Sequence, residues 1–409
     1  MQEDSSKKSA VYLSPNQKAW GRLKRNKSAI LGMLIIFLAI FLAIFAYVLA
    51  PDKTPFANDQ ILEIRTEEPG FNVLMLKRKK DQNIKREWFF NRVLSGQASE
   101  YESIPIKSYE ISGPNIVVDR YTGSEYGVEL DTFNLAAVVH RLNTMNNEVK
   151  FENGRFSFQN FDGEQVDAEY AKVREIVEAK HIQKKIYYLG TDKFGRDNLS
   201  RLLLGVRVSL SVGLIAVMVS LVIGITLGAL AGYYRGWVDD VIMYVINVFW
   251  SVPLLLWVFA LVIIFQREYW LIFVAVGLVM WVEVARIVRG QFFSLREKDF
   301  VEASRSLGFS DMRTIFKHIL PNTVGPIIVI TAANFASAII IEAGLSFLGI
   351  GVQPPRPSWG GILNEYYKYI GTSKSFLAIL PGVCILILTL GFNLVGNGIR
   401  DALDVRTSN

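Results

Sequence analysis

Two acidic residues lie inside strongly apolar runs of the chain. Glu342 stands in the run IIIEAGLSF. A carboxylate is costly in hydrocarbon, so we expect Glu342 either to pair with a group across a subunit interface or to line a pathway. Glu283 lies one helical turn from Arg286, and a local ion pair is a sufficient explanation for it.

Other reactive side chains are few. His140 and His181 have no neighbouring Cys and no cluster of acids, a pattern more typical of ordinary residues than of metal ligands. The only cysteine, Cys384, falls in an apolar run, which excludes an intrachain disulfide. The chain contains no GxxxxGK[ST] motif for nucleotide binding. We assign no catalytic residue, no metal site and no cofactor.

Composition indicates a membrane protein with an unevenly distributed charge. The chain has 409 residues, of which 51% are hydrophobic, and its net charge is +6. Residues 51–188 carry 22 acidic and 19 basic residues, whereas the other 271 residues carry 16 acidic and 25 basic ones. Basic residues accumulate on cytoplasmic loops of membrane proteins. No basic stripe interleaved with aromatic residues is present, so we expect the partner to be the lipid bilayer and not nucleic acid.

Six segments are apolar and long enough to cross a bilayer, which takes about 20 residues. They are residues 29–50, 208–233, 240–265, 270–288, 323–350 and 375–397. Pro253 is expected to bend the third of them. Gly224, Gly228 and Gly232 are four residues apart in the second, a spacing that lets two helices approach closely in lipid.

The distribution of Lys and Arg predicts the orientation of these spans. The leader before residue 29 carries seven basic and two acidic residues, which places the N-terminus in the cytoplasm. Six crossings return the C-terminus to the same side, make the loop 289–322 cytoplasmic and leave residues 51–188 outside. Just before the second span, Leu199, Leu202, Leu203 and Val206 share one face, which predicts a segment that lies along the outer membrane surface.

The segment 51–188 has the features of a folded domain. Residues 115–121 and 155–161 form short β-type runs, bounded by the turn signals SGPN and ENGR. Residues 168–186 follow a helical pattern. We therefore predict an α+β insert domain, to which we assign no chemistry.

A patterned polar segment, EASRSLGFSDMRTIFKHILPN, occupies residues 302–322 between two apolar runs. It predicts a first helix ended by Gly308 in a left-handed conformation and a second helix capped by Ser310 and stopped by Pro321. In the second helix Met312, Ile315, Phe316 and Ile319 recur with helical spacing. An interfacial helix on lipid and a docking surface for another protein both fit this pattern.

The same segment resembles the EAA loop of ABC importer permeases. That motif runs Glu-Ala-Ala, three residues, Gly, nine residues, Ile, one residue, Leu-Pro, and it is matched here by Glu302, Ala303, Gly308, Leu320 and Pro321. Ser304 replaces the second Ala and His318 replaces the Ile, changes that keep the small residues at the start and the Gly turn. The runs LGTDKFGRDNLSRLLLGVRVSL, FKHILPN and EAGLSFLGIGVQPPRPSWG resemble the C-type subunit of the oligopeptide, dipeptide and nickel permeases.

The resemblance is close over residues 188–405 and loose over the leader and the first span. It implies an all-α polytopic membrane protein with six transmembrane helices, the type I ABC importer permease fold, carrying an α+β extracytoplasmic insert that is longer than usual in that subunit. The expected divisions are a leader at 1–28, a first span at 29–50, the insert at 51–188, and the permease domain at 189–405 with its coupling loop at 289–322.

The resemblance also implies function and partners. We expect a permease subunit of an ATP-driven peptide importer in the bacterial inner membrane, acting with a second homologous permease, two cytoplasmic ABC ATPases and an extracytoplasmic binding protein. A nickel-chelate permease is the alternative within the family. A membrane-anchored receptor is an alternative from another class, which the six spans argue against.

Three sets of residues are expected to carry this function. The coupling residues are Glu302, Ala303, Ser304, Gly308, Asp311, Leu320 and Pro321. The residues of the pathway or of a subunit interface are Glu342, Pro253, Gly224, Gly228 and Gly232. The outer loop contributes Pro354, Pro355 and Trp359 as a gate or binding-protein contact, with Trp359 as an anchor at the membrane interface.

Overall fold

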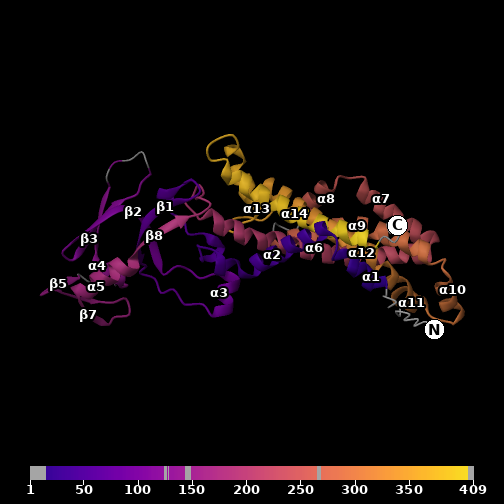
Figure 1. Ribbon diagram of the computed structural model, residues 1–409, viewed down its shortest axis with the longest axis horizontal. Helices are drawn as coiled ribbons and strands as arrows, with labels where there is room; N and C mark the ends of the chain where they lie inside the picture. Colours follow the sequence, from indigo (N-terminus) through magenta and orange to yellow (C-terminus); the bar gives the residue numbers. More distant parts are fainter. Residues whose placement is uncertain (1–14, 124–126, 128, 143–148, 265–268, 404–409) are drawn as a thin grey trace, which may run out of the picture.

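The computed structural model describes the chain except residues 1–14, 124–126, 128, 143–148, 265–268 and 404–409. The molecule is elongated, with a domain of two β-sheets at one end and a bundle of long helices at the other (Figure 1). The chain enters the sheet domain from helix α2 (Lys27–Leu49) and leaves it into helix α6 (Asn198–Tyr234). The short helix α1 (Pro15–Leu23) precedes α2.

The insert domain is built on an antiparallel five-stranded sheet in the order β4-β3-β2-β1-β8. Its strands are β1 (Phe71–Lys79), β2 (Tyr101–Ser112), β3 (Asn115–Arg120), β4 (Leu130–Asn134) and β8 (Ile182–Tyr187). A second sheet contains β5 (Lys150–Glu152), β6 (Arg155–Gln159) and β7 (Gln165–Glu169). The helical elements are α3 (Phe89–Ser95), α4 (Leu135–Val139), α5 (Tyr170–Ile176), a π-helical turn at Val177–His181 and 3-10 turns at Pro55–Ala57 and Leu62–Ile64.

One core joins the two sheets through the short helices α4 and α5. Ile116 of the larger sheet, Phe156 of the smaller one, and Leu135 and Val177 of the helical segments are fully buried in it. The alternation of apolar residues along β3 and β6 places their side chains on this inner face. The prediction of a sheet-containing insert is confirmed.

The predicted helix at 168–186 is right for its first part and wrong for its last. The chain is helical over Tyr170–His181, but Ile182–Tyr187 forms β8 and pairs antiparallel with β1. The unpaired backbone groups along β1 require a partner strand, and this tertiary pairing overrides the local helical pattern.

The helical bundle continues from α6 through α7 (Gly236–Trp250), α8 (Leu254–Ile264) and α9 (Tyr269–Leu295) to the hairpin helices α10 (Asp299–Ser306) and α11 (Asp311–Thr314). A π-helical turn at Ile315–Ile319 leads into α12 (Leu320–Phe347), followed by α13 (Trp359–Tyr366), a 3-10 turn at Tyr367–Tyr369 and α14 (Phe376–Leu403). Among the described residues, five helices are long and apolar enough to cross a membrane, or six if α7 and α8 together form one span.

The third predicted span, 240–265, is not one continuous helix. The helices α7 and α8 meet at an angle of 89° across the break that contains Pro253. Proline lacks a backbone N–H and its ring clashes with the preceding turn, so a helix cannot continue straight through it. The expected bend at Pro253 is confirmed, and α7 and α8 make up the third predicted span only if the bent pair crosses the membrane as one segment.

The expected surface segment before the second span is also wrong. The helix α6 begins at Asn198 and runs without a break, and Asp197 caps it by accepting a hydrogen bond from the Ser200 N–H at 2.8 Å. Leu202 and Val206 are each only 5% exposed, because they pack against neighbouring helices of the chain.

The glycine stripe of α6 lies against α9, as its spacing predicts. A Cβ added at Gly224 lies 2.5 Å from the Val284 Cβ, and one added at Gly228 lies 2.4 Å from the Ala285 carbonyl oxygen. At Gly232 the corresponding distance to the Arg289 carbonyl oxygen is 2.6 Å. Close packing is therefore confirmed, but it joins two helices of the same chain, so the assignment of this stripe to a subunit interface is wrong.

A buried ion cluster joins the segment that leads into α6 to helix α13. Asp192, which precedes α6, accepts hydrogen bonds from Arg196 (2.6 Å) and Arg201, and both arginines lie near Glu365 of α13, at 3.4 and 3.5 Å. Asp192, Arg196 and Arg201 are almost completely buried. Removing one member would leave an uncompensated buried charge, which is strongly destabilising.

Candidate functional site

Gly308 closes the turn between α10 and α11. Its φ of 76° lies in the left-handed region that favours glycine. Its N–H donates to the Arg305 carbonyl at 2.8 Å, and the Phe309 N–H donates to the Ser304 carbonyl at 3.2 Å. These two bonds form a Schellman motif, so the predicted left-handed end of the first helix is confirmed.

The inner face of the hairpin is tightly packed. Val301, Thr314, Ile315 and Ile319 are buried, and so is Ser304, at 3% exposure. The Ser304 hydroxyl donates to the Val301 carbonyl at 2.7 Å and lies 3.5 Å from the Thr314 hydroxyl. The serine that departs from the EAA pattern therefore lies inside the hairpin, where only a small side chain fits.

The outer face of the hairpin exposes apolar side chains. Leu307 is 73% exposed, Phe316 61% and Met312 53%, and Glu302 and Ala303 are exposed beside them. Of the predicted apolar stripe, Ile315 and Ile319 are buried, whereas Met312 and Phe316 remain exposed. Large apolar side chains left at the tip of a helical hairpin mark a contact surface for another molecule.

Two predicted features of the second helix are wrong. Ser310 precedes α11 with extended backbone, but its side chain makes no capping hydrogen bond. Pro321 does not end the helix, because the chain remains helical from Asp311 to Phe347. The Leu320 N–H donates to the Ile315 carbonyl in the π-helical turn, and this wider turn carries the helix past the missing N–H of Pro321.

Tyr233 ties the hairpin to the end of α6. Its hydroxyl donates to the Asp311 carboxylate at 2.6 Å, and the Arg305 guanidinium lies over its ring, 5.1 Å from the centroid. The side chains of Asp311 and Arg305 therefore both make contacts within the chain. Tyr233 itself was missed, since it lies 78 residues away and no local pattern links it to the loop.

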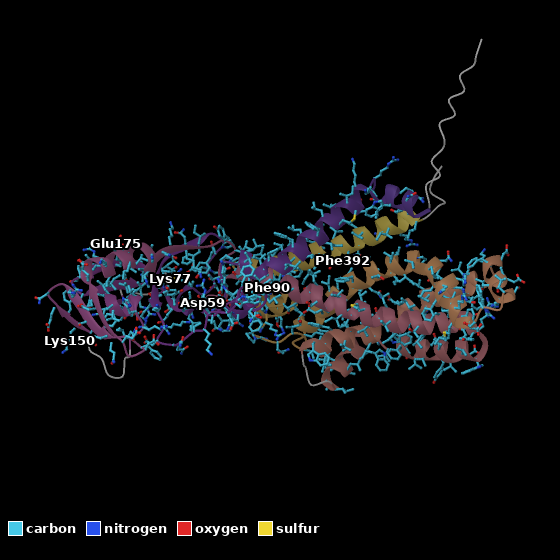
Figure 2. All side chains as sticks on the ribbon, turned by 90° about the horizontal axis from the view of Figure 1, so that it is seen from below. Asp59, Lys77, Phe90, Lys150, Glu175 and Phe392 are labelled. Atoms are coloured by element: carbon cyan, nitrogen blue, oxygen red, sulfur yellow. The ribbon has the colours of Figure 1, made fainter. Side chains whose placement is uncertain are left out.

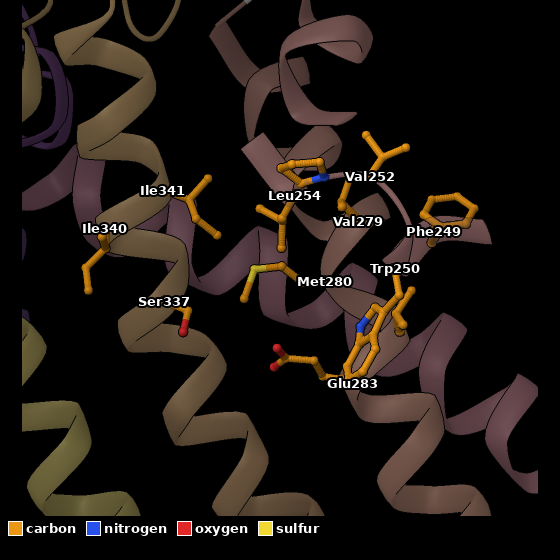
Figure 3. A pocket seen from close by; sticks show the side chains of 12 residues that line it. Phe249, Trp250, Val252, Leu254, Val279, Met280, Glu283, Ser337, Ile340 and Ile341 are labelled. Atoms are coloured by element: carbon orange, nitrogen blue, oxygen red, sulfur yellow. The ribbon is translucent and has the colours of Figure 1, made fainter. Parts of the chain in front are cut away.

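A pocket of about 500 Å³ opens between α7, α8, α9 and α12 (Figure 3). The Glu283 carboxylate points into the space between α9 and α12, and Ser337 of α12 lies on the opposite wall (Figure 3). The break at Pro253 brings Val252 and Leu254 into the lining.

The predicted pairing of Glu283 with Arg286 is wrong. Within the part of the chain that the structure describes, no basic group forms an ion pair with Glu283. The Arg286 guanidinium instead lies 3.4 Å from the centroid of the Trp250 ring, and Arg289 pairs with Asp239 at 2.5 Å. Because the Arg286 guanidinium stacks on the Trp250 ring, it does not pair with Glu283, and the Glu283 carboxylate faces the pocket.

Glu342 is fully buried within the chain, so neither predicted role describes it. Its carboxylate accepts a hydrogen bond from the Ser346 hydroxyl at 2.7 Å, and that hydroxyl also accepts one from the Val352 N–H at 3.1 Å. The carboxylate thus holds the turn after α12. A residue with 0% exposure neither lines a pathway nor contacts a second subunit.

Trp359 is an internal contact and not an anchor in the membrane interface. It is 3% exposed, and its indole N–H donates to the Leu202 carbonyl of α6 at 2.9 Å. Gly205 makes room for the ring, since a Cβ there would lie 2.6 Å from it. Pro354 and Pro355 are exposed, so the loop presents these two prolines outward.

The long apolar helices fit a polytopic membrane protein. Residues 224–409 match the family model described as binding-protein-dependent transport system inner membrane component. Residues 14–65 match the N-terminal TM domain of oligopeptide transport permease C.

Three known proteins illustrate the similarity. The chain is 42% identical over 218 residues to a glutathione transport system permease protein of Pectobacterium atrosepticum, and the aligned region covers 53% of this chain and 72% of the relative. It is 40% identical over 218 residues to a dipeptide transport system permease protein of Alkalihalophilus pseudofirmus, covering 53% and 71%. A solved MetNI methionine ABC transporter, in an inward-facing conformation, is 20% identical, with a TM-score of 0.42 over 50% of this chain and 96% of that one.

The chain belongs to the family of binding-protein-dependent transport system inner membrane components, and it resembles the C-type permeases of ABC importers. This is a family of transport permeases and not of enzymes. Membership implies a membrane complex that includes an ATPase and a binding protein.

Proposed function

We propose that this chain is one of two permease subunits of an ATP-driven importer, with the hairpin α10–α11 as the element that couples it to a cytoplasmic ATPase. The observation that carries the proposal is the difference between the two faces of the hairpin. Its inner face is packed and its turn is fixed by Gly308, while Leu307, Met312 and Phe316 remain exposed at its tip. A rigid knob with an apolar tip fits a cleft of a partner protein and transmits that partner's movement.

Glu302 and Ala303 lie where such a partner would reach the hairpin. Both are exposed on α10, at the edge of the apolar tip. The small Ala303 permits close approach, and the Glu302 carboxylate accepts hydrogen bonds from Arg side chains or backbone N–H groups of the partner. Ser304 supports the knob from within, and Asp311 holds it to Tyr233, while Leu320 is half-buried and Pro321 is exposed where the next helix begins.

We assign the translocation pathway to the face that carries Glu283 and the Pro253 break. The pocket between α7, α8, α9 and α12 is largely apolar and contains one carboxylate opposite one hydroxyl. A second homologous permease packed over this face would enclose the pocket. A carboxylate there suits the cationic amino group of a peptide.

Peptides are the proposed substrate class. The relatives compared above are named for glutathione and for dipeptides, which favours peptides over nickel chelates. The proposed orientation places both termini and the hairpin in the cytoplasm, and the insert domain outside, near the site where a binding protein delivers substrate. Two ATPase subunits, one for each permease, complete the proposed assembly.

Substitution at Gly308 tests the coupling role. Proline cannot adopt a φ of 76° and has no N–H to donate to Arg305, so Gly308→Pro removes the Schellman motif. Gly308→Asn is the matched control, because asparagine tolerates the left-handed region and a Cβ at this position meets no atom within 4 Å. We expect Gly308→Pro to abolish substrate-stimulated ATPase activity of the assembled complex, and Gly308→Asn to retain it.

The measurement separates coupling from assembly when the amount of inserted subunit is determined in parallel. Normal insertion with lost stimulation supports the proposal. Full stimulation by the proline variant would exclude the hairpin as the coupling element.

A further inference from the structure

The helix α3 (Phe89–Ser95) of the insert domain presents an unusual set of exposed side chains. Trp88, Phe89, Phe90 and Leu94 are 70%, 64%, 58% and 66% exposed. None of the residues of α3, all of which the structure describes, is buried. We call these four residues the aromatic cluster. So many large apolar groups on one short segment require a partner.

The position of α3 along α2 is fixed by Arg207 of α6. The guanidinium donates to the carbonyls of Ala43 (2.5 Å) and Ile44 (3.0 Å) in α2 and to those of Val93 (2.8 Å) and Leu94 (2.7 Å) in α3. One side chain thus joins three helices. It holds the end of α3 beside the last turns of α2 and not beyond them.

This depth can be estimated from helix geometry. Ile44 precedes Leu49, the last residue of α2, by five residues, which corresponds to about 8 Å at 1.5 Å per residue. The whole of α2 spans about 34 Å by the same measure, slightly more than the hydrocarbon thickness of about 30 Å. With the excess shared between both ends of α2, the level of Ile44 falls in the outer part of the hydrocarbon, about 6 Å below the boundary with the headgroups.

The segment that carries α3 is held rigidly in this place. A Cβ at Gly96 would lie 2.7 Å from the Tyr47 ring and 2.7 Å from the Lys53 carbonyl, so the chain turns directly against the end of α2. The Gln97 side chain accepts a hydrogen bond from the Glu87 N–H at 2.8 Å and donates to the Lys85 carbonyl at 3.1 Å. The segment that carries the aromatic cluster is therefore held against the end of α2 by these contacts.

The surface next to the cluster is largely apolar. A groove of about 1240 Å³ runs between α3, α2 and α6, and Ile40, Ile44, Phe90 and Leu214 lie in its lining. Phe90 lies where the insert domain meets the long helices, whereas Lys150 and Glu175 lie in the part of the domain away from them (Figure 2). The apolar surface of the spans thus continues without interruption onto the insert domain.

We propose that the aromatic cluster is inserted into the bilayer interface, so that lipid acyl chains fill the groove and the insert domain contacts the membrane directly. Trp and other aromatic side chains are favoured at this depth. The exposed Lys85 and Arg86, directly before the cluster, then lie at the level of the lipid phosphates. The proposal requires only that α2 spans the membrane, and it does not depend on the coupling role of the hairpin.

Fluorescence quenching in lipid nanodiscs tests this placement. In a Cys384→Ala background, single cysteines at Phe90, at Phe37 of α2 and at Lys150 are labelled with bimane. Phe37 is 69% exposed on α2 and serves as the lipid-facing control, while the exposed Lys150 is the aqueous control. The quenchers are phospholipids with a nitroxide on the acyl chain, and iodide in the buffer.

We expect the label at position 90 to lose as much fluorescence to nitroxide lipid as the label at position 37, and to be protected from iodide. The label at position 150 should show the reverse. Quenching at position 90 by iodide alone would overturn the proposal and make the aromatic cluster a surface for a protein partner. Arg207→Gln should reduce lipid quenching at position 90 and leave it unchanged at position 37; unchanged quenching at both would refute the positioning role of Arg207.

Discussion

Gly228 is the point where the packing of α6 against α9 is closest, so replacing it by alanine gives a sharp test of the helix bundle. The added methyl carbon would lie 2.4 Å from the Ala285 carbonyl oxygen, 2.9 Å from the Val288 Cβ and 3.0 Å from the Ala285 Cα. All three atoms belong to α9, and two of them are backbone atoms. No rotation of a flexible side chain relieves this overlap.

The size of the effect follows from the distances. Carbon atoms pack best at about 3.5 to 4.0 Å, so α9 would have to move away by about 1 Å along its contact with α6. Overpacking of this kind typically costs about 1 to 3 kcal/mol. Gly344→Ala in α12 is the matched control, since a Cβ there meets no atom within 4 Å. It replaces a helical glycine without a clash and should stabilise the chain by up to about 1 kcal/mol.

Thermal unfolding of the purified protein in detergent, followed by fluorimetry, measures the difference. Gly228→Ala should lower the midpoint relative to the unchanged chain, and Gly344→Ala should keep or raise it. Equal midpoints for the two variants would refute the close α6–α9 contact. So would a Gly228→Ala variant more stable than the control.

Three further outcomes are expected. In a cysteine-free background and with the outer membrane opened, a cysteine at Lys150 should react with an impermeant maleimide. A cysteine at Ser310 should react only after the inner membrane is permeabilised. Reaction of the cysteine at Ser310 before permeabilisation contradicts the proposed orientation. Glu283→Gln should reduce peptide import about tenfold or more, because a charge-assisted hydrogen bond contributes about 1.5 to 3 kcal/mol, while substitution of an exposed acid elsewhere should not. Burial lowers the pKa of His140 and of His181 below 6.5, so the unfolded chain binds more protons at these two residues than the folded chain does. The stability of the insert domain should therefore fall as the pH drops below about 6.5 and stay constant above it. Resistance to proteolysis measures this stability.

Local patterns predicted those features that a local rule determines. The left-handed turn at Gly308 follows from the position of a glycine just after a helical segment. The bend at Pro253 follows from the missing N–H, and the close approach at Gly228 follows from the four-residue spacing. In each case the residue type restricts the backbone or the distance between helices, whatever the rest of the chain does.

Long-range contacts decided the features that the sequence did not predict. Trp359 was expected at the membrane interface, but Gly205, 154 residues earlier, leaves a recess for its ring. Glu342 was expected to face a partner, but the turn after α12 supplies its hydrogen bond through Ser346. Ile182–Tyr187 is a strand because it pairs with the edge of β1 that β2 leaves free. None of these partners is visible in the local sequence.

The contacts of α6 and α9 bear on how movement of the hairpin would reach the pocket. Gly228 locks the two helices together, and Tyr233, at the end of α6, holds Asp311 of the hairpin. The hairpin follows α9 directly along the chain, so it is joined to both helices of the locked pair. Displacement of the hairpin by an ATPase would therefore move α6 and α9 as one body, together with Glu283. The segment α7–α8, broken at Pro253, is the wall of the pocket that can change its angle against that body. We infer that opening and closing of the pocket occurs at this break, because an interrupted helix bends at less cost than the tightly packed α6–α9 pair separates.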